Sequence, residues 1–306
     1  MKDLIIVFSP QSNAAKFVLS GLDIKNVTIV PLCKRKNIIY KIIARILFKL
    51  KLNKYAAYLK YESNVRRQLS DDHKKILFFD CLQFYEYEII NAIIKSSDKH
   101  IFFWNPISIW SNNKECLRNY IIKFRNLGFK LATFDFKDAD TYKMELKKNV
   151  NRRFLIKENA KEMNDFYFLG KPKGREAQVR AIESKLKEYG FSTNFKLVKA
   201  ACDYVTLDEN ILLSAKSRCI VDLTSPNQTG FTLRPFDALF LHKKLLTTNK
   251  AILKTDFYRP ENVFYFDGNN MHDIIKFMSE EMVDIPDNIV SQYEVNQWVK
   301  DNYLND

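Results

Sequence analysis

Short apolar runs alternate with longer amphipathic segments along most of the chain. In the first half, apolar runs predict strands at residues 4–8, 27–30, 75–79, 101–104 and 130–134. The intervening segments predict helices over residues 13–22, 37–61, 85–95 and 113–127. Alternating strands and helices of this kind build parallel sheets with helices on both faces. The strands are apolar throughout rather than at every second position, which indicates burial on both sides.

The alternation lapses into a polar, charged stretch at residues 152–164, which predicts a linker, and then restarts. Further strands are predicted at residues 166–169, 195–198, 219–223, 245–248 and 263–266. Helices are predicted at 176–189, 208–216 and 232–241, followed by two terminal helices that begin near residues 271 and 288. We therefore predict an α/β protein of two domains, one over residues 1–155 and one over residues 156–306.

Composition narrows the class of protein. The 306 residues are 46% hydrophobic, which excludes disorder, and charges recur too often for a membrane-spanning run of about 18 residues. Residues 1–8 include Asp3 and predict a first strand rather than a signal peptide. Five scattered cysteines without a C-x-x-C pair fit a reducing cytosol, and argue against a disulfide framework or a zinc ribbon. The chain has seven glycines and neither G-x-G-x-x-G nor G-x-x-x-x-G-K-[ST], which argues against dinucleotide dehydrogenases and P-loop enzymes.

Two loops in the second half are the first candidates for ligand binding, because open parallel sheets bind ligands beyond the carboxyl ends of their strands. The loop at 170–175 precedes a predicted helix, whose N-terminus favours an anion. It combines two glycines with three cations: Gly170, Lys171, Lys173, Gly174 and Arg175. This pattern predicts a phosphate site, although an ordinary basic turn has the same composition.

The second loop, at 224–230, precedes a predicted helix that carries Arg234 and Asp237 near its start. A carboxylate at that place can accept hydrogen bonds from two ribose hydroxyls, and an arginine one turn earlier can reach a phosphate. A carboxylate that only complements the helix dipole would look the same.

The stretch Cys219–Tyr258 resembles the donor-binding half of GT-B glycosyltransferases, particularly the bacterial enzymes of lipopolysaccharide and capsule assembly. Common members carry two glutamates with seven residues between them around the loop, where this chain has Thr229 and Asp237. The turn at 170–175 is similar to the family's diphosphate-binding turn. The segment 133–142 is similar to an interdomain segment of the same bacterial group.

The resemblance implies two Rossmann-like domains that face a cleft, with the terminal helices returning to the first domain. A nucleotide-sugar would be the donor, and a lipid-linked, lipopolysaccharide or capsule glycan the acceptor. The implied donor-binding residues are those of the turn at 170–175 together with Gln228, Thr229, Gly230 and Asp237. Asp237 would hold the ribose.

Catalysis would depend on stabilising the departing nucleotide phosphate, a role for Lys171, Arg175 and Arg234 that requires no metal. An inverting transfer also needs a base for the acceptor hydroxyl, and Asp80, at the end of a predicted strand, is the first candidate. A retaining transfer needs no such base. We expect no cofactor besides the donor.

Metal ligation has one formal motif, the D-x-D of Asp138 and Asp140. Its position after Asp135 is more typical of the acidic first turn of a helix. The four histidines lack ligand spacing, and no G-x-S-x-G elbow is present. We therefore expect no metal site.

The excess of positive over negative charge lies entirely in the first half of the chain. Up to residue 160 there are 30 basic and 15 acidic residues, a net charge of +15, and the remainder has a net charge of −2. Residues 34–67 alone hold eleven cations and one acid, with isoleucines at helical spacing. This pattern is typical of an amphipathic helix on an anionic membrane, and equally of a helix with its apolar face in the core.

The charge therefore points to the acceptor side of the proposed reaction: an anionic membrane surface or a phosphorylated glycolipid. We expect a cytoplasmic enzyme, peripheral on the inner face of the membrane if residues 34–67 bind lipid. The alternative is a basic nucleic-acid-binding or RNA-modifying α/β protein. Aliphatic rather than aromatic residues interleave the basic stretch, and no nucleic-acid-binding module is recognisable, so we expect no nucleic acid partner.

Overall fold

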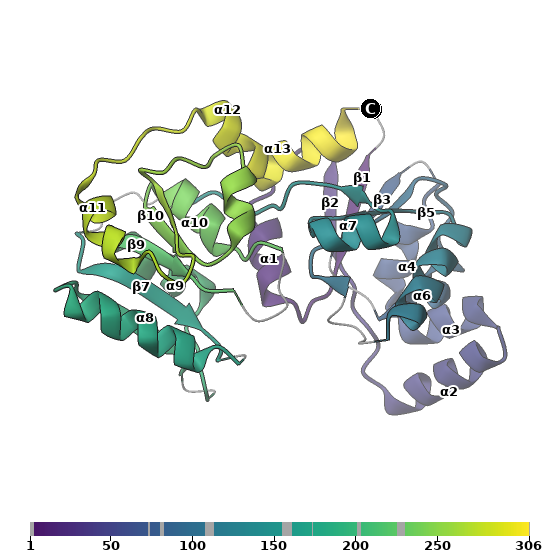
Figure 1. The fold of residues 1–306 in the computed structure, drawn as a ribbon. Coiled ribbons are helices and arrows are strands. Elements are labelled where there is room, and N and C mark those ends of the chain that lie inside the picture. Colours follow the sequence, from purple (N-terminus) through teal and green to yellow (C-terminus); the bar gives the residue numbers. More distant parts are fainter. Residues whose placement is uncertain are drawn as a thin grey trace. The chain divides into compact units, whose positions relative to one another are not determined.

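The chain divides into two compact units, each built around its own sheet (Figure 1). In this computed structural model the described residues are 3–72, 74–79, 83–107, 113–154, 161–172, 174–200, 203–224 and 230–305. The first unit comprises Met1–Asn149 and Val299–Asp306, and the second comprises Val150–Trp298.

The first unit contains a sheet of six parallel strands in the order β2-β1-β3-β4-β5-β6. Every residue of the central strands β1 and β3 is buried, so both faces of the sheet are covered. The strands are β1 (Leu4–Phe8), β2 (Val27–Pro31), β3 (Lys75–Phe79), β4 (Lys99–Phe103), β5 (Phe129–Thr133) and β6 (Glu145–Leu146).

Helices connect these strands. They are α1 (Asn13–Leu19), α2 (Ile38–Lys49), α3 (Asn53–Lys60), α4 (Ser63–Leu69), α5 (Phe84–Asn91), α6 (Lys114–Asn126) and α7 (Phe136–Tyr142). A final π-helix, η6 (Lys300–Leu304), belongs to the same unit, where Lys147 Nζ donates to Asn302 Oδ1 (3.2 Å) and lies over the Tyr303 ring.

The stretch 37–61 is helical as predicted, but it is broken into α2 and α3. α2 ends in a Schellman motif, in which the amides of Lys51 and Leu52 donate to the carbonyls of Phe48 (3.0 Å) and Leu47 (2.9 Å). Lys51 has a φ of 60°, the left-handed conformation that is usually left to glycine. Because a lysine occupies this position, nothing in the sequence marks the break.

The second unit contains a sheet of five parallel strands in the order β11-β10-β9-β7-β8. These are β7 (Asn164–Gly170), β8 (Thr193–Leu197), β9 (Ser217–Asp222), β10 (Lys244–Thr247) and β11 (Val263–Tyr265). Its helices are α8 (Glu176–Glu188), α9 (Leu207–Ala215), α10 (Arg234–Leu241), η3 (Lys250–Lys254), η4 (Met271–Asp273), α11 (Ile274–Ser279), α12 (Asp287–Val290), η5 (Ser291–Tyr293) and α13 (Val295–Val299).

Apolar side chains cover both faces of this second sheet. Phe166, Phe168 and Val221 point into one core with α8 and α11, while Ile220 and Leu245 point into another with Phe236 of α10. Neighbouring strand residues such as Ile220 and Val221 thus face opposite sides, as the uninterrupted apolar runs predicted. The predicted fold class, two parallel Rossmann-like α/β domains, is confirmed.

Both sheets follow the order 2-1-3-4-5 when their strands are numbered within each unit, with β6 added to the first. In this order the chain leaves the first and third strands toward opposite edges, which opens a crevice between their carboxyl ends. That switch point lies between β1 and β3 in the first unit and between β7 and β9 in the second. Among the described helices, none is long and apolar enough to span a lipid bilayer.

Candidate functional site

The two loops selected from the sequence follow the strands that border the second switch point. β7 ends at Gly170 and β9 ends at Asp222, and the two strands pair directly. The loop after β7 leads to α8, which begins at Glu176, and the loop after β9 leads toward α10, which begins at Arg234. Side chains from both loops therefore meet at the crevice where parallel sheets bind ligands.

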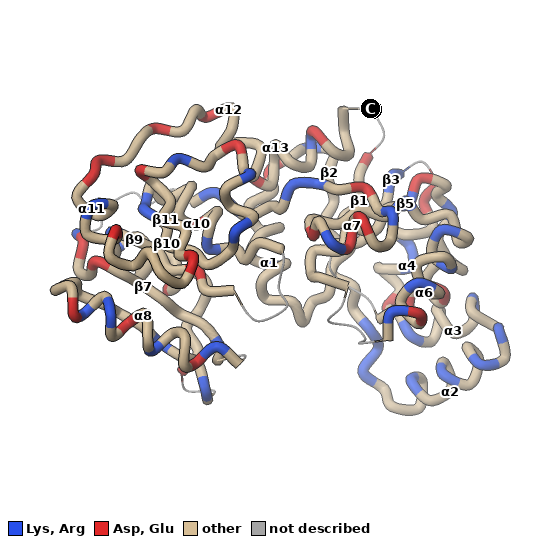
Figure 2. Tube along the Cα trace, in the orientation of Figure 1, with Lys and Arg blue, Asp and Glu red and all other residues tan. Residues whose placement is uncertain are grey.

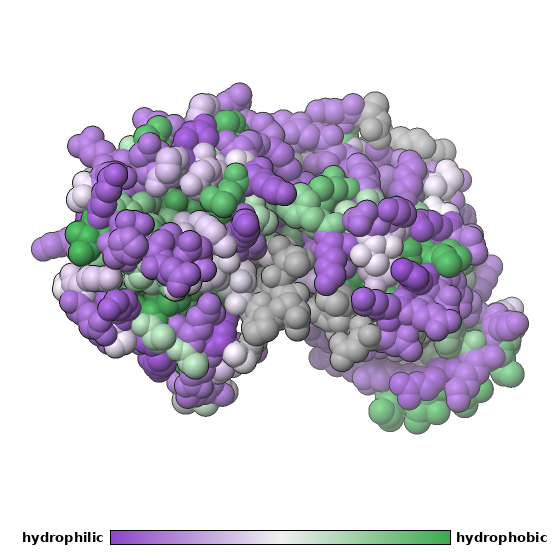
Figure 3. Space-filling model, in the orientation of Figure 1, coloured by the Kyte–Doolittle hydropathy of each residue, from purple (hydrophilic) through white to green (hydrophobic). Residues whose placement is uncertain are grey.

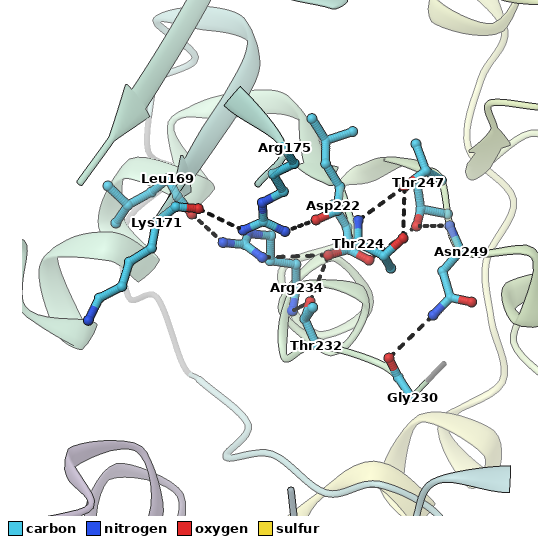
Figure 4. Close-up of polar contacts among 12 residues, drawn as sticks. Leu169, Lys171, Arg175, Asp222, Thr224, Gly230, Thr232, Arg234, Thr247 and Asn249 are labelled. Atoms are coloured by element: carbon cyan, nitrogen blue, oxygen red, sulfur yellow. Dashed lines mark hydrogen bonds and ion pairs between the residues drawn. The ribbon is translucent and has the colours of Figure 1, made fainter. Parts of the chain in front are cut away.

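Two arginines meet at this crevice, one from the start of each helix (Figure 4). Arg175, which is 6% exposed, donates from Nη1 to the carbonyl of Leu223 and from Nη2 to the carbonyl of Lys171 (3.4 Å). Arg234 donates from Nη2 to the carbonyl of Leu169, and its Nη1 lies 3.5 Å from Asp222 Oδ1. Both guanidinium groups lie over the ring of Phe168, at 5.4 and 5.3 Å from its centroid. We call Arg175, Arg234 and Asp222 the arginine cluster.

Gly170 makes room for the arginine cluster. A methyl group on its Cα would lie 2.8 Å from Nη2 of Arg175 and 3.2 Å from Nη2 of Arg234. Such distances are shorter than van der Waals contact, so a side chain here would displace the guanidinium groups. The reason for glycine at this position is therefore close approach and not backbone conformation.

Asp222 is the anionic member of the cluster, and the sequence analysis missed it. Its side chain is fully buried and accepts hydrogen bonds from Thr232 Oγ1 (2.8 Å) and Thr247 Oγ1 (3.1 Å). Next to it, Thr224 and Thr248 pair through their hydroxyls (3.2 Å), and Asn249 Nδ2 donates to the carbonyl of Gly230 (3.4 Å). The signal was an acid that directly follows an apolar strand, Cys219-Ile220-Val221.

The charges at this place do not balance. Asp222 pairs with Arg234, whereas Arg175 donates to main-chain carbonyls, and Lys171 adds a third cation whose Nζ lies 5.1 Å from the ring centroid of the exposed Tyr204. Burial lowers the pKa of Arg175, and the charge of Arg234 lowers it further. Among the described residues, the site therefore retains an excess of positive charge at a helix N-terminus, which is the condition for binding an anion such as a phosphate.

Asp237 lies in the first turn of α10 and is 5% exposed. Its Oδ1 accepts a hydrogen bond from Asn151 Nδ2 (2.8 Å). Burial raises the pKa of this carboxyl to about 7, while the Asn151 hydrogen bond and the charge of Arg234 oppose the rise. Asp237 thus acts electrostatically on the arginine cluster, and its role in holding a ribose stays a prediction.

The remaining site residues are placed as follows. Gly174 lies in the turn before α8 with a φ of +77°, and Gly230 lies beside Asn249. The structure thus brings together Gly170, Lys171, Arg175 and Arg234. The predicted base and three predicted donor contacts lie outside the described residues: Asp80, Lys173, Gln228 and Thr229.

The D-x-D motif is split between two environments. Asp138 is buried on α7, accepts the amide of Ile107 (2.6 Å) and has a pKa raised to about 6 by burial, whereas the exposed Asp140 pairs with Lys143 (3.1 Å). Asp135 caps α7 by accepting the amides of residues 137 and 138. In the described part of the chain, no group of three or more acidic, histidine or cysteine side chains is arranged to hold a metal ion.

Comparison with known proteins adds no name, since no family model and no curated protein matches the chain. The fold and the local chemistry of this site are therefore the grounds on which a function can be inferred.

Proposed function

We propose that the protein is a GT-B-type glycosyltransferase that moves a sugar from a nucleotide-sugar donor to a lipid-linked, lipopolysaccharide or capsule acceptor. The observation that carries the proposal is the arginine cluster. Two guanidinium groups and one buried carboxylate, which pairs with Arg234, lie at the switch point of a parallel sheet, directly beside a glycine that admits close approach.

In this proposal the donor diphosphate lies against Lys171, Arg175 and Arg234. A diphosphate supplies the negative charge that the cluster lacks, and the first turn of α8 adds its helix dipole. The exposed ring of Tyr204, beside Lys171, offers a face on which a nucleobase can stack. Asp237 would accept the ribose hydroxyls.

The chemistry needs one bond to form and one to break. The acceptor oxygen bonds to the anomeric carbon, and the bond between that carbon and the diphosphate oxygen breaks, so negative charge develops on the leaving group. Arginine and lysine side chains placed at that oxygen stabilise the charge without a metal ion. In an inverting transfer the acceptor proton passes to a base, for which Asp80 stays the candidate.

Calorimetry and thermal shift test the proposal. Uridine, guanosine, thymidine and cytidine nucleotide-sugars and their free nucleotides are each titrated into the full chain, with the matching nucleosides as controls. We expect one nucleotide series to raise the melting temperature, because a ligand that binds the native state stabilises it. The nucleosides, which lack phosphates, should have much less effect.

Two results would contradict the proposal. One is that no nucleotide-sugar raises the melting temperature. The other is tight, salt-sensitive RNA binding without nucleotide-sugar binding, which would favour the nucleic-acid alternative.

A further inference from the structure

The outward face of α2 is a row of exposed isoleucines. Residues 38, 39, 42, 43 and 46 are all exposed, and Ile46 and Leu50 keep 52% and 63% of their surface in contact with solvent. In Figure 3, green residues line the lower edge of the molecule where Figure 1 shows α2. We call residues 38, 39, 42, 43, 46 and 50 the isoleucine face.

The isoleucine face is not the face that folds the helix onto its unit. Ala44 is 2% exposed, and Phe48 packs against Tyr85 of α5 at 5.8 Å between ring centroids. Ala44 and Ile46 are two residues apart, or about 200° around an α-helix, so they lie on opposite sides. The sequence left open whether the isoleucines enter the core, and the structure places them outside it.

Three cations follow one edge of the isoleucine face: Lys41, Arg45 and Lys49. Among the described residues, no acid forms an ion pair with any of them. By contrast, Lys34 and Lys60 both pair with the buried Glu86, at 2.7 and 2.6 Å. Glu86 thus pairs with lysines outside the isoleucine face, and Figure 2 shows basic residues along α2 with no acid on that helix.

A cavity of about 670 Å³ opens between α2 and α5 on this edge. Its lining combines five cations of α2 and its approach with apolar side chains such as Ile42 and Ile89. Apolar walls with a cationic rim suit a molecule that has a hydrocarbon part and an anionic head.

We propose that α2 docks on a bilayer that contains anionic phospholipids. The isoleucine face enters the boundary between head groups and acyl chains, and Lys41, Arg45 and Lys49 contact phosphates, as in interfacial amphipathic helices. This inference does not depend on the proposed glycosyl transfer.

Charge selects the lipid surface over other partners. A second copy of the chain would bring an equally basic face against this one, which like charges oppose. A nucleic acid would satisfy the cations but leave the isoleucines exposed to water. An anionic bilayer satisfies both groups at once.

The experiment is cosedimentation of the full chain with vesicles of phosphatidylcholine and phosphatidylglycerol in equal parts, and with vesicles of phosphatidylcholine alone. We expect binding to the anionic vesicles and at least about tenfold weaker binding to the neutral ones. The variants Ile42→Ser/Ile46→Ser and Lys41→Gln/Arg45→Gln/Lys49→Gln should each weaken binding to anionic vesicles at least about tenfold.

The matched control is Ile122→Ser/Ile275→Ser, which removes two isoleucines of similar exposure (53% and 51%) from α6 and α11. It should bind vesicles like the wild type. All variants change exposed side chains, so their melting temperatures and nucleotide binding should stay at wild-type values. Vesicle binding and nucleotide binding are thus separate readouts, and either proposal can fail without the other.

The proposal is overturned if the Ile42→Ser/Ile46→Ser variant binds anionic vesicles as the wild type does, or if both vesicle types bind equally. It is also overturned if the wild type ignores vesicles and instead dimerises in light scattering through the isoleucine face. Salt-sensitive RNA binding in place of vesicle binding would overturn it as well.

Discussion

The two sheets have the same strand order but very different residues at their switch points. In the first unit, β1 is followed by the uncharged run Ser9–Asn13, and residues 34–67, which include α2, α3 and α4, hold eleven of the basic residues. In the second unit, whose half of the chain has almost no net charge, cations from two loops meet directly at the ends of β7 and β9. The net charge of a region thus gives no indication of whether cations gather at its switch point.

The difference shows which part of the molecule determines ligand chemistry. A parallel sheet offers a crevice at its switch point, and the loops decide whether that crevice attracts an anion. In the first unit, the cations of α2 lie on an outer helical surface. In the second unit, Arg175 and Arg234 lie at the crevice itself. We therefore expect anion-linked effects to be confined to the second unit.

Removal of either arginine of the cluster should have the largest effect. Arg175→Ala and Arg234→Ala are each expected to lower the turnover number about hundred- to thousandfold, because each removes charge from the departing diphosphate. The measurement is steady-state transfer with the donor identified by thermal shift.

Arg125→Ala in the first unit is the matched control. Arg125 also donates to main-chain carbonyls, those of Tyr142 (2.5 Å) and Lys143 (2.7 Å). Arg125→Ala should lower the free energy of unfolding, while the turnover number per folded molecule stays unchanged. Wild-type turnover in Arg175→Ala or Arg234→Ala would remove that arginine from the proposed mechanism.

Asp222→Asn tests the acidic member of the arginine cluster. Loss of the buried carboxylate leaves Arg234 without its partner and places an amide donor near the two threonine hydroxyls, so unfolding should become easier by on the order of 3 kcal/mol. Inorganic pyrophosphate should then stabilise the variant more than the wild type, since no carboxylate competes for the guanidinium groups. Urea unfolding with and without pyrophosphate measures both effects, and an equal gain for the two proteins would argue against an anion site here.

Each unit also buries one carboxyl in the first turn of a short helix, Asp138 in α7 and Asp237 in α10. For Asp237 the folded pKa of about 7 lies above the ordinary value of 3.8, so the native state holds a proton that the unfolded chain has released. Stability should therefore fall as pH rises, by about 2 kcal/mol between about pH 5 and pH 7, and then level off.

Asp237→Asn should abolish this loss and raise stability above that of the wild type at about pH 8, because a neutral amide is buried there without a charge penalty. It should also weaken nucleotide binding, since an amide is a poorer acceptor for two ribose hydroxyls. Asp138→Asn is the comparison variant: it should alter the profile at lower pH, where its pKa of about 6 lies, and leave nucleotide affinity unchanged. Unaltered nucleotide affinity in Asp237→Asn would remove Asp237 from the donor site.

The elements that the sequence predicted well are those set by apolar runs. Residues 4–8 and 75–79 form β1 and β3 with the predicted bounds because burial on both faces leaves an uninterrupted apolar signal. The break at Lys51 was missed because its left-handed conformation is adopted by a lysine and not a glycine. The two-residue strand β6 was missed because both of its residues are exposed and carry no pattern.

Only part of the candidate site could be predicted from the sequence. Lys171, Arg175 and Arg234 could be chosen from the rule that ligands bind beyond strand ends, which needs only the order of elements. Asp222 lies at a strand end too and was overlooked, but its pairing with Thr232 and Thr247 could not be predicted, because those threonines come from other segments and meet it only in the fold. Strand order, which places β7 beside β9, is also a property of the fold that periodicity does not reveal.

The smallest effects are expected from substitutions of two glycines near one turn. One glycine is needed for the close approach of the guanidinium groups, and the other for its backbone conformation. Gly170→Ala places a methyl against both guanidinium groups, so nucleotide affinity should fall about tenfold, the loss of one well-placed charged contact. Gly174→Ala meets nothing within 4 Å but must adopt a φ of +77°, which costs about 1 kcal/mol of stability. Calorimetry and thermal melting on both variants should thus give opposite outcomes: weaker binding at nearly constant stability for the first, and lower stability at constant affinity for the second. If both variants lose only stability, Gly170 serves the turn alone, and the arginine cluster does not require the space beside it to bind an anion.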